Sequence, residues 1–289
     1  MINKNLKLAI QKNGRLTEET LEFLRRSGLE FESYKQKLYS VCRNFPLDIL
    51  FTRDDDIPDY VASGNVDLGI VGQNMLYEVR PRVKKLLNLR YGFCYLGVAI
   101  PKESKIESII GLKNTKIATS FPNSTKEFFR KKRIDIEIVK INGSVEVAPA
   151  MGMAAGIVDL ISTGSTLALN DLRVITRIYE SEAALIQNPK ASSSPAKKVL
   201  IEKLMTRFKG VLSAKTYKYI MMNAPENILP KLKKIVPGLK SPTISPLAKK
   251  GWISVQVVVK EDIFWETIDK LKISGASGII VLPIEKIIT

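Results

Sequence analysis

Apolar positions along the chain follow two alternating periods. Short runs of aliphatic and β-branched residues are separated by stretches in which apolar residues return every three or four positions, as on one face of a helix. The stretch 17–28 is typical of these helices, because Thr17 can cap its first turn and Gly28 can end its last. The alternation predicts an α/β architecture with largely parallel sheets. The predicted strands are residues 6–10, 47–52, 66–71, 94–100, 115–120, 136–141 and 156–161.

The order of predicted elements changes after the serine-rich turn at 191–196 and a helix near 197–212. The remaining chain predicts the order βαββαβ, which is that of small ferredoxin-like, ligand-sensing modules. A purely structural assembly domain is the alternative explanation. The elements expected there are strands at 217–224, 242–247, 252–259 and 277–283 and helices at 226–236 and 261–275.

Composition excludes several kinds of chemistry. The chain of 289 residues contains no histidine, which rules out Ser-His and Cys-His nucleophile pairs, histidine general bases and histidine-ligated zinc. Carboxylates, cations, hydroxyls, backbone amides and an oxygen-preferring metal such as Mg²⁺ remain. The net charge of +16 suits polyanionic small molecules. Nucleic acid is not expected as a partner, because the basic residues are scattered and no helix-turn-helix or zinc-finger spacing occurs.

The distribution of apolar residues also bears on location. No stretch reaches the roughly 18 apolar residues that a membrane span needs, and the apolar run near the start is too short for a signal peptide. We therefore expect a cytoplasmic protein without a membrane partner. Cys42 and Cys94 stand alone and are expected to be reduced thiols.

Three strand-to-helix junctions, at residues 9–17, 119–128 and 162–166, carry the residue types that bind anions. Hydroxyls and backbone N–H groups at a helix start can surround a phosphate, and the helix dipole adds partial positive charge. Each junction alone is weak evidence, because Ser, Thr and Gly are also the usual capping and turn residues. Three together favour substrates with several phosphates. The first junction contains Gln11, Lys12, Gly14 and Arg15.

Carboxylates accompany these junctions. Arg53 precedes Asp54, Asp55 and Asp56 at a predicted helix start, where capping of the helix explains at least one of the acids. Asp159 is different, because it lies inside an apolar strand and therefore needs a partner such as a sugar hydroxyl or a metal-bound water. Glu146 is the other acid that we expect near a ligand.

Residues 64–75 and 156–167 align without gaps, and Asp67 is the counterpart of Asp159 in this alignment. Two explanations stay open. Any two βα units share such a pattern, or the chain forms two similar lobes with a ligand held at the carboxyl ends of strands from both.

Motifs spread over essentially the whole chain resemble one enzyme family. In chain order they read QKNGRL, TRDDDIP, VDLGIVG, IATSFP, NGSVEVAP, DLISTGSTL and YIMMNAP. Their order and separations resemble those of the ATP phosphoribosyltransferases, which commit phosphoribosyl pyrophosphate to histidine biosynthesis. The C-terminal module points to the long form of that family, which carries its own regulatory domain. The Walker motif GxxxxGK[ST] does not occur, so ATP hydrolysis on that pattern is not expected.

The resemblance implies a fold, an activity and a regulation. The implied fold has a two-lobed, periplasmic-binding-protein-like catalytic region, with lobe I in 1–94 and 184–214 and lobe II in 95–183, and a ferredoxin-like regulatory domain in 215–289. The implied activity transfers the 5-phosphoribosyl group of phosphoribosyl pyrophosphate to N1 of the adenine of ATP. Mg²⁺ is the implied cofactor, held mainly by substrate phosphates. The implied regulation is feedback inhibition by histidine in a homo-hexamer that exchanges with a dimer.

The resemblance and the chemistry of the reaction together suggest roles for single residues. A sugar that becomes cationic calls for nearby carboxylates, and a leaving pyrophosphate calls for cations. Asp159, Glu146 and Arg15 are the predicted catalytic residues: Asp159 at the ribose, Glu146 near the donor ribose or the metal, and Arg15 at phosphates. The predicted 5-phosphate loop is Ser162, Thr163, Gly164, Ser165 and Thr166. The predicted nucleotide ligands are Gln11, Lys12, Gly14, Arg53, Asp54 and Phe121, and the predicted histidine ligands are Asn223, Leu239, Thr243 and Gly278.

Two positions depart from the pattern of many relatives. Phe121 stands where tyrosine is common, so stacking on adenine is retained but a hydroxyl contact is lost. Asn223 stands where some relatives have an acid, which weakens the expected contact with the amino group of histidine. A competing function is that of a non-catalytic, small-molecule-binding or regulatory protein with the same two lobes. The complete DLISTGSTL loop favours the enzyme.

Overall fold

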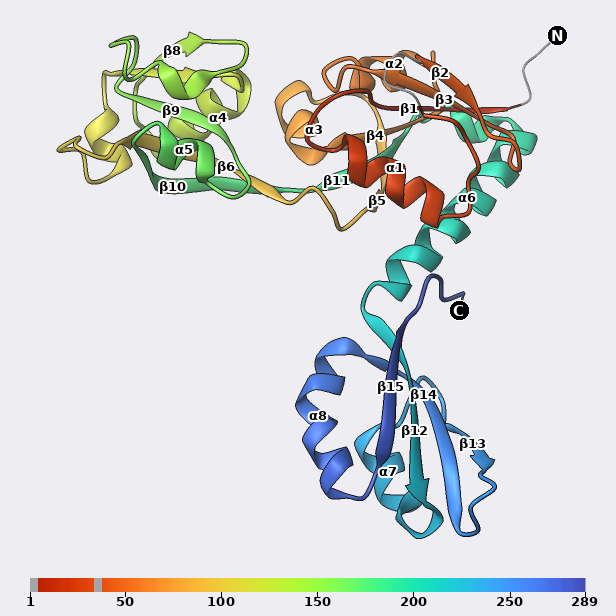
Figure 1. Ribbon diagram of the computed structural model, residues 1–289. Coiled ribbons are helices and arrows are strands. Elements are labelled where there is room, and N and C mark those ends of the chain that lie inside the picture. The colour runs from red at the N-terminus through yellow and green to blue at the C-terminus, as the bar shows by residue number, and fades with distance from the viewer. Residues whose placement is uncertain (1–4, 34–37, 289) are drawn as a thin grey trace. The chain divides into compact units, whose positions relative to one another are not determined.

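The computed structural model describes residues 5–33 and 38–288 (Figure 1). The chain divides into two compact units, one of Met1–Glu22 with Leu29–Ile201 and one of Phe23–Gly28 with Glu202–Thr289. Residues 1–4 and 34–37 of the predicted lobe I, and residue 289 of the predicted regulatory domain, lie outside the described residues.

The first sheet of the first unit has the strand order β2-β3-β1-β4-β11-β5. Its centre is parallel, because β1 pairs in parallel with β3 and β4, whereas β2, β11 and β5 run antiparallel to their neighbours. We call this sheet and its helices the first lobe. Its elements are β1 (Leu6–Gln11), α1 (Thr17–Arg26), β2 (Tyr39–Val41), β3 (Leu47–Thr52), α2 (Ile57–Ser63), β4 (Leu68–Gly72), α3 (Gln73–Val79), β5 (Lys84–Asn88), β11 (Ala183–Gln187) and η3 (Ala191–Ser193). Helix α6 (Pro195–Ala214) continues from this unit into the second, which begins at Glu202 and also takes the end of α1 from Phe23.

The second sheet of the same unit has the order β10-β6-β9-β7-β8 and forms what we call the second lobe. Strand β7 pairs in parallel with β8 and β9, whereas β6 runs antiparallel to β9 and β10. Its elements are β6 (Cys94–Pro101), η1 (Ile109–Leu112), β7 (Lys116–Thr119), α4 (Pro122–Lys132), β8 (Glu137–Lys140), η2 (Val145–Val147), β9 (Gly156–Ile161), α5 (Ser165–Leu169) and β10 (Leu172–Ser181).

Close packing of α2 on the first sheet explains a glycine in β4. A Cβ built on Gly69 would stand 2.7 Å from a methyl of Ile57 and 2.8 Å from a methyl of Val61, so a larger residue does not fit there. Ile57 and Val61 are fully buried. The helix is thereby held against the sheet, and its N-terminus remains beside the carboxyl end of β3.

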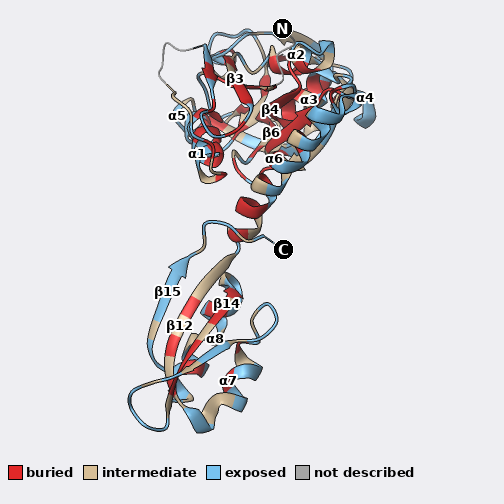
Figure 2. Cartoon of the chain, turned by 90° about the vertical axis from the view of Figure 1, so that its right-hand side faces the viewer, coloured by how far each residue is buried: buried red, intermediate tan, exposed pale blue. Residues whose placement is uncertain are grey.

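The second unit contains an antiparallel sheet with the order β13-β14-β12-β15. The predicted order βαββαβ is confirmed in β12 (Tyr217–Pro225), α7 (Leu229–Ile235), β13 (Thr243–Pro246), β14 (Trp252–Lys260), α8 (Glu261–Ile273) and β15 (Ser277–Pro283), with η4 (Glu226–Ile228) ahead of α7. Figure 2 shows buried positions along β12 and β14, whereas β15 is mostly exposed.

The predicted α/β class is confirmed, and three details differ. The sheets of the first unit are mixed, because only their centres are parallel. Four strands were not among those predicted, namely β2, β5, β10 and β11. The predicted helix at 17–28 ends at Arg26, and Gly28 follows with a φ of +73°.

Candidate active site

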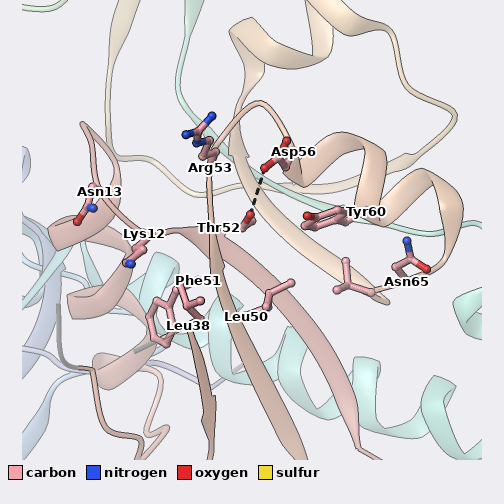
Figure 3. A pocket seen from close by; sticks show the side chains of 11 residues that line it. Lys12, Asn13, Leu38, Leu50, Phe51, Thr52, Arg53, Asp56, Tyr60 and Asn65 are labelled. Atoms are coloured by element: carbon pink, nitrogen blue, oxygen red, sulfur yellow. Dashed lines mark hydrogen bonds between the residues drawn. The ribbon is translucent and has the colours of Figure 1, made fainter. Parts of the chain in front are cut away.

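A pocket opens beside the carboxyl ends of β1 and β3 (Figure 3). Its volume of ≈ 860 Å³ lies within the range of small-molecule sites, about 300–1,000 Å³. Two predicted nucleotide ligands, Lys12 and Arg53, line the pocket and give it positive charge. Asn13, Tyr60 and Asn65 line it as well. The sequence analysis did not predict these three as ligands, because a single polar residue in a loop or on a helix gives no recognisable pattern. Of the three, Asn13 is the one within a family motif, QKNGRL.

The loop after β1 is built around Gln11. This residue is buried, and its Oε1 accepts the backbone N–H of Leu16 at 3.0 Å. Gly14 has a φ of +138°, and a Cβ on it would stand 2.3 Å from Nε2 of Gln11. Gln11 and Gly14 therefore shape the loop that presents Lys12, and their direct contact with a nucleotide stays a prediction.

Asp54, which follows the pocket residue Arg53, interacts electrostatically with Arg15. Burial is the largest cause that raises the pKa of Asp54, and the charge of Asp55 acts in the same direction, whereas backbone hydrogen bonds and the Arg15 guanidinium lower it. Arg15 Nη1 donates a hydrogen bond to the carbonyl oxygen of Gly92. Its Nη2 is 3.3 Å from the place where a Cβ of Gly72 would stand, so Arg15 reaches the start of α3.

The second lobe contains a pair of acids. Asp159 lies on β9, and Glu146 lies in η2, the short turn between β8 and β9. Burial raises the pKa of Asp159 to about 6, the backbone N–H of Leu160 lowers it, and the negative charge of Glu146 raises it. That N–H is 2.8 Å from Asp159 Oδ1. Two interacting, half-buried carboxylates favour a sugar hydroxyl or a cation between them.

The hydroxyl-rich loop joins β9 to α5. Gly164 is the N-cap of α5 with a φ of +79°, a left-handed conformation that favours glycine. Thr163 Oγ1 lies 2.9 Å from Ser165 Oγ, and Ser162 Oγ donates to the carbonyl oxygen of Phe93 at 3.3 Å. The side chains exposed on this loop are those of Ser162, Thr163, Ser165 and Thr166. The loop thus presents hydroxyls at a helix start, as phosphate-binding loops do.

The second predicted anion site, at 119–128, is corrected by the structure. The N-terminus of α4 already holds a carboxylate of the protein, because Glu78 of α3 accepts the N–H groups of Asn123 and Ser124, both at 2.8 Å. Phe121, just before α4, is only 9% exposed and belongs to the hydrophobic core. Its stacking on adenine therefore gains no support from this placement and stays a prediction.

The two acids of the internal repeat have different surroundings. Asp67 is buried; its Oδ2 accepts the N–H of Lys7 at 3.0 Å, and its Oδ1 lies 2.7 Å from Lys197 Nζ. The helix starts of the two segments correspond, with Gly72 and Gly164 as N-caps, but Asp67 precedes its strand whereas Asp159 lies within β9. Asp67 is therefore held by contacts within the protein, whereas a ligand at Asp159 stays a prediction.

Comparison with protein-family models adds a decisive finding. The model described as ATP phosphoribosyltransferase matches residues 53–210, which include the acid pair and the hydroxyl-rich loop. The chain belongs to the ATP phosphoribosyltransferase family. A second model, described as HisG, C-terminal domain, matches residues 214–286 and identifies the long form of the family.

Curated relatives agree with this membership. An ATP phosphoribosyltransferase from Cytophaga hutchinsonii is 45% identical over 98% of this chain and 98% of its own length. One from Bacteroides thetaiotaomicron is 44% identical over 98% of this chain and 99% of its own length. The family resemblance drawn from the motifs is thereby confirmed, and so is the prediction of an enzyme, a transferase of histidine biosynthesis.

Solved structures with a similar fold include a member of the same family. A chain of the ATP phosphoribosyl transferase (HisG:HisZ) complex from Thermotoga maritima is 29% identical with a TM-score of 0.60, covering 71% of this chain and 98% of that chain. Tv2483 bound to L-arginine is 13% identical with a TM-score of 0.50, covering 72% of this chain and 85% of that chain, and shares the fold alone.

In the C-terminal module of this ATP phosphoribosyltransferase, two of the predicted histidine ligands are neighbours. Gly278 has a φ of +56°, and a Cβ on it would stand 3.3 Å from Asn223 Nδ2. Thr243 lies on β13 and is separated from β12 by β14, while Leu239 is 51% exposed in the loop before β13. The structure of one chain therefore pairs Asn223 with Gly278 but does not bring all four residues together.

Within residues 5–33 and 38–288, no three Asp, Glu or Cys side chains gather in a way that could hold a metal ion. No helix among these residues has the length and apolar character required to cross a bilayer.

Proposed function

We propose that this ATP phosphoribosyltransferase transfers the 5-phosphoribosyl group of phosphoribosyl pyrophosphate to N1 of the adenine of ATP, releasing pyrophosphate. The observation that carries the proposal is the acid pair, Asp159 and Glu146, on the same βα unit of the second lobe as the exposed hydroxyl loop at 162–166. Carboxylates suit the ribose of the donor, and the loop suits its 5-phosphate.

The residues act by charge and position. As the bond from the anomeric carbon to the pyrophosphate oxygen breaks and the bond to N1 forms, the sugar becomes cationic. Asp159 is ionised above a pH of about 6 and stabilises that charge. Adenine N1 is already a neutral nucleophile, so no general base is required. Catalysis then depends largely on holding both substrates in line.

ATP is assigned to the pocket of the first lobe. Lys12 and Arg53 line it and offer cations to the triphosphate, while Tyr60 and Asn65 offer a ring and an amide. Arg15 and Asp54 lie near this pocket, where Arg15 is available for a phosphate of either substrate. Thr52 Oγ1 donates to Asp56 Oδ2 at 3.4 Å and helps to hold the loop that carries Arg53.

Mg²⁺ is the proposed cofactor. The residues present fit it, because Glu146 offers a carboxylate beside Asp159, and Mg²⁺ in nucleotide enzymes is commonly bound by one or two carboxylates together with substrate phosphates, which would hold most of the ion. When bound, the ion would neutralise charge on the pyrophosphate group that leaves.

Regulation and assembly complete the proposal. Histidine inhibits through the C-terminal module, where the amide of Asn223 on β12 lies beside Gly278 on the edge strand β15. The enzyme acts in the cytoplasm as a homo-hexamer that exchanges with a dimer, and neither nucleic acid nor a membrane is a partner. The match of residues 214–286 to the C-terminal domain model supports the regulatory part.

The test is an assay of phosphoribosyl-ATP formation from ATP and phosphoribosyl pyrophosphate, with Mg²⁺ and after its removal by EDTA. We expect product only when both substrates and Mg²⁺ are present. No product under complete conditions would refute the substrate assignment, and undiminished turnover in EDTA would refute the cofactor.

A further inference from the structure

Two chain crossovers join the lobes of the first unit. One leads from β5 to β6 and the other from β10 to β11. The crossovers are hydrogen-bonded to each other, because Leu89 N–H donates to Ala183 O at 2.8 Å and Ala183 N–H donates to Tyr91 O at 3.0 Å. Two adjacent crossing strands make a hinge, since residues at the ends of elements can absorb backbone rotation. A contact away from the crossovers is needed to fix the hinge angle.

Such a contact connects α3 of the first lobe with α4 of the second. The carboxylate of Glu78 accepts the N–H of Asn123 through Oε1 and the N–H of Ser124 through Oε2, both at 2.8 Å. Asn123 Nδ2 returns a hydrogen bond to the carbonyl oxygen of Glu78 at 3.1 Å. We call these three residues the Glu78 cap. A carboxylate at a helix N-terminus is favoured by unpaired N–H groups and by the helix dipole.

The surroundings hold the Glu78 cap in place. Glu78 is only 8% exposed, so water competes little for its carboxylate. Tyr179 of β10 donates from its hydroxyl to Ser124 Oγ at 3.2 Å, and its ring lies 4.6 Å from that of Tyr77 of α3. Burial raises the pKa of Tyr179 to about 12, and the charge of Glu78 contributes to this shift.

The position of α3 gives the cap a functional meaning. Helix α3 begins directly after β4, where Arg15 approaches Gly72, and its last turn carries Glu78. Helix α4 begins directly after β7, which is the parallel neighbour of the strand that carries Asp159. The seven residues of α3 therefore connect the proposed nucleotide half of the site to the proposed donor half.

We propose that Glu78 is a positioning residue that fixes the angle between the two lobes, and thereby the separation of the two substrates. It touches no reacting atom and acts through α4. The kinetic consequence rests on the proposed function, whereas the effect on the lobe angle does not.

A matched control is available on the same two helices. Glu127 of α4 forms ion pairs with Arg80, which follows α3, and with Lys131, but Arg80 is 61% exposed and Glu127 is 30% exposed. Exposed ion pairs contribute little, so Glu127→Gln should leave the lobe angle unchanged. Glu78→Ala removes the cap, and Glu78→Gln keeps the shape and one acceptor oxygen.

The first experiment measures the lobe angle in the full chain without substrates. Spin labels at Asp59→Cys on α2 and Lys132→Cys on α4 report the interlobe distance by electron double resonance; both positions are exposed, and the native Cys42 and Cys94 are buried. We expect a narrow distribution in the parent and in Glu127→Gln, a broad one in Glu78→Ala and an intermediate one in Glu78→Gln. A narrow, unshifted distribution in Glu78→Ala overturns the proposal; if that variant does not fold, Glu78→Gln decides by the same criterion.

The second experiment separates positioning from binding. In Glu78→Ala, kcat should fall by about tenfold or more, the factor that corresponds to one charge-assisted hydrogen bond, while the Kd of ATP alone stays within about twofold. Glu78→Gln should recover part of kcat. A parental kcat in a variant with a broad distance distribution overturns the positioning role. Absence of product from the unmodified enzyme would refute the proposed function, and the distance distributions would still decide the role of Glu78.

Discussion

Asp67 and Asp159 occupy equivalent positions in an internal sequence repeat, yet their carboxylates have different contacts in the folded chain. Asp67 receives a backbone N–H and an ammonium group, whereas Asp159 receives the N–H of the next residue and has Glu146 as a like-charged neighbour. A titratable group that the fold leaves at a raised pKa is often one that meets a substrate. The contrast can be tested by making the same substitution at both positions.

Asp159→Asn should lower kcat by about 100-fold or more, because it removes a charge that stabilises the transition state. Asp67→Asn should instead lower the free energy of unfolding by about 1–3 kcal/mol with little effect on kcat, because it breaks buried polar contacts. Steady-state kinetics and thermal melting of both variants check this. Full activity of Asp159→Asn would refute the role of Asp159 at the ribose and indicate a structural role.

The pKa of Asp159 also predicts a dependence of stability on pH. Because burial raises the pKa to about 6 in the folded state from an ordinary value of 3.8, the folded state binds the proton more tightly than the unfolded state. Stability should therefore fall as the pH rises from about 4 to about 6 and level off above. Asp159→Asn should remove this slope and raise the melting temperature at pH 7. Melting curves across this range measure it, and parallel slopes in both proteins would contradict the assignment.

The hydroxyl loop makes a separate prediction. Changing Thr163 and Thr166 together to Ala should raise the KM for phosphoribosyl pyrophosphate by an order of magnitude or more, since each hydrogen bond to an ionised phosphate contributes roughly 1.5–3 kcal/mol. Folding should be nearly unchanged, because both side chains are exposed. Kinetics with each substrate varied in turn provide the measurement; an unaltered KM for the donor would place the 5-phosphate elsewhere.

At the scale of elements, continuous apolar runs were sufficient to predict the central strands. Strand β10 was not predicted, because its side chains are mostly half-buried or exposed and the polar residues of LRVITRIYES interrupt the apolar run. Strand β5 carries two lysines and a similar exposure. Strand β11 could have been found, since AALIQ is an apolar run that is wholly buried.

The sequence indicated residue types suited to a substrate site better than it indicated tertiary contacts between distant residues. Asp159, Glu146 and the hydroxyl loop could be proposed from the sequence because an acid in an apolar strand and a cluster of Ser, Thr and Gly are unusual, and their contact with substrate stays a prediction. The Glu78 cap was not, because Glu78 and Asn123 are far apart in sequence and an acid near the end of a short helix looks like any solvated residue. Contacts that only the tertiary fold creates leave no local signature.

The C-terminal module should be separable in function. A chain that ends after Lys215 keeps the whole of α6 and lacks all of β12 to β15. We expect this truncated enzyme to form phosphoribosyl-ATP and to lose its response to histidine, because the proposed effector residues are removed. Initial rates with and without histidine, beside circular dichroism of both chains, test this; inhibition that persists would move the effector site into the catalytic lobes.

At the scale of the whole molecule, the order of strands has a consequence for synthesis. Strand β11 lies between β4 and β5 in the first sheet, although it follows the entire second lobe in the chain. On the ribosome, the second sheet is complete once β10 has emerged, whereas β5 has no neighbour to pair with until β11 arrives. The first lobe should therefore complete its folding after the second lobe, although most of it is translated earlier. Hydrogen exchange of chains stalled on the ribosome after β10 should show amides of β6, β7 and β9 protected and those of β5 unprotected. Protection of β5 before β11 has emerged would contradict this order.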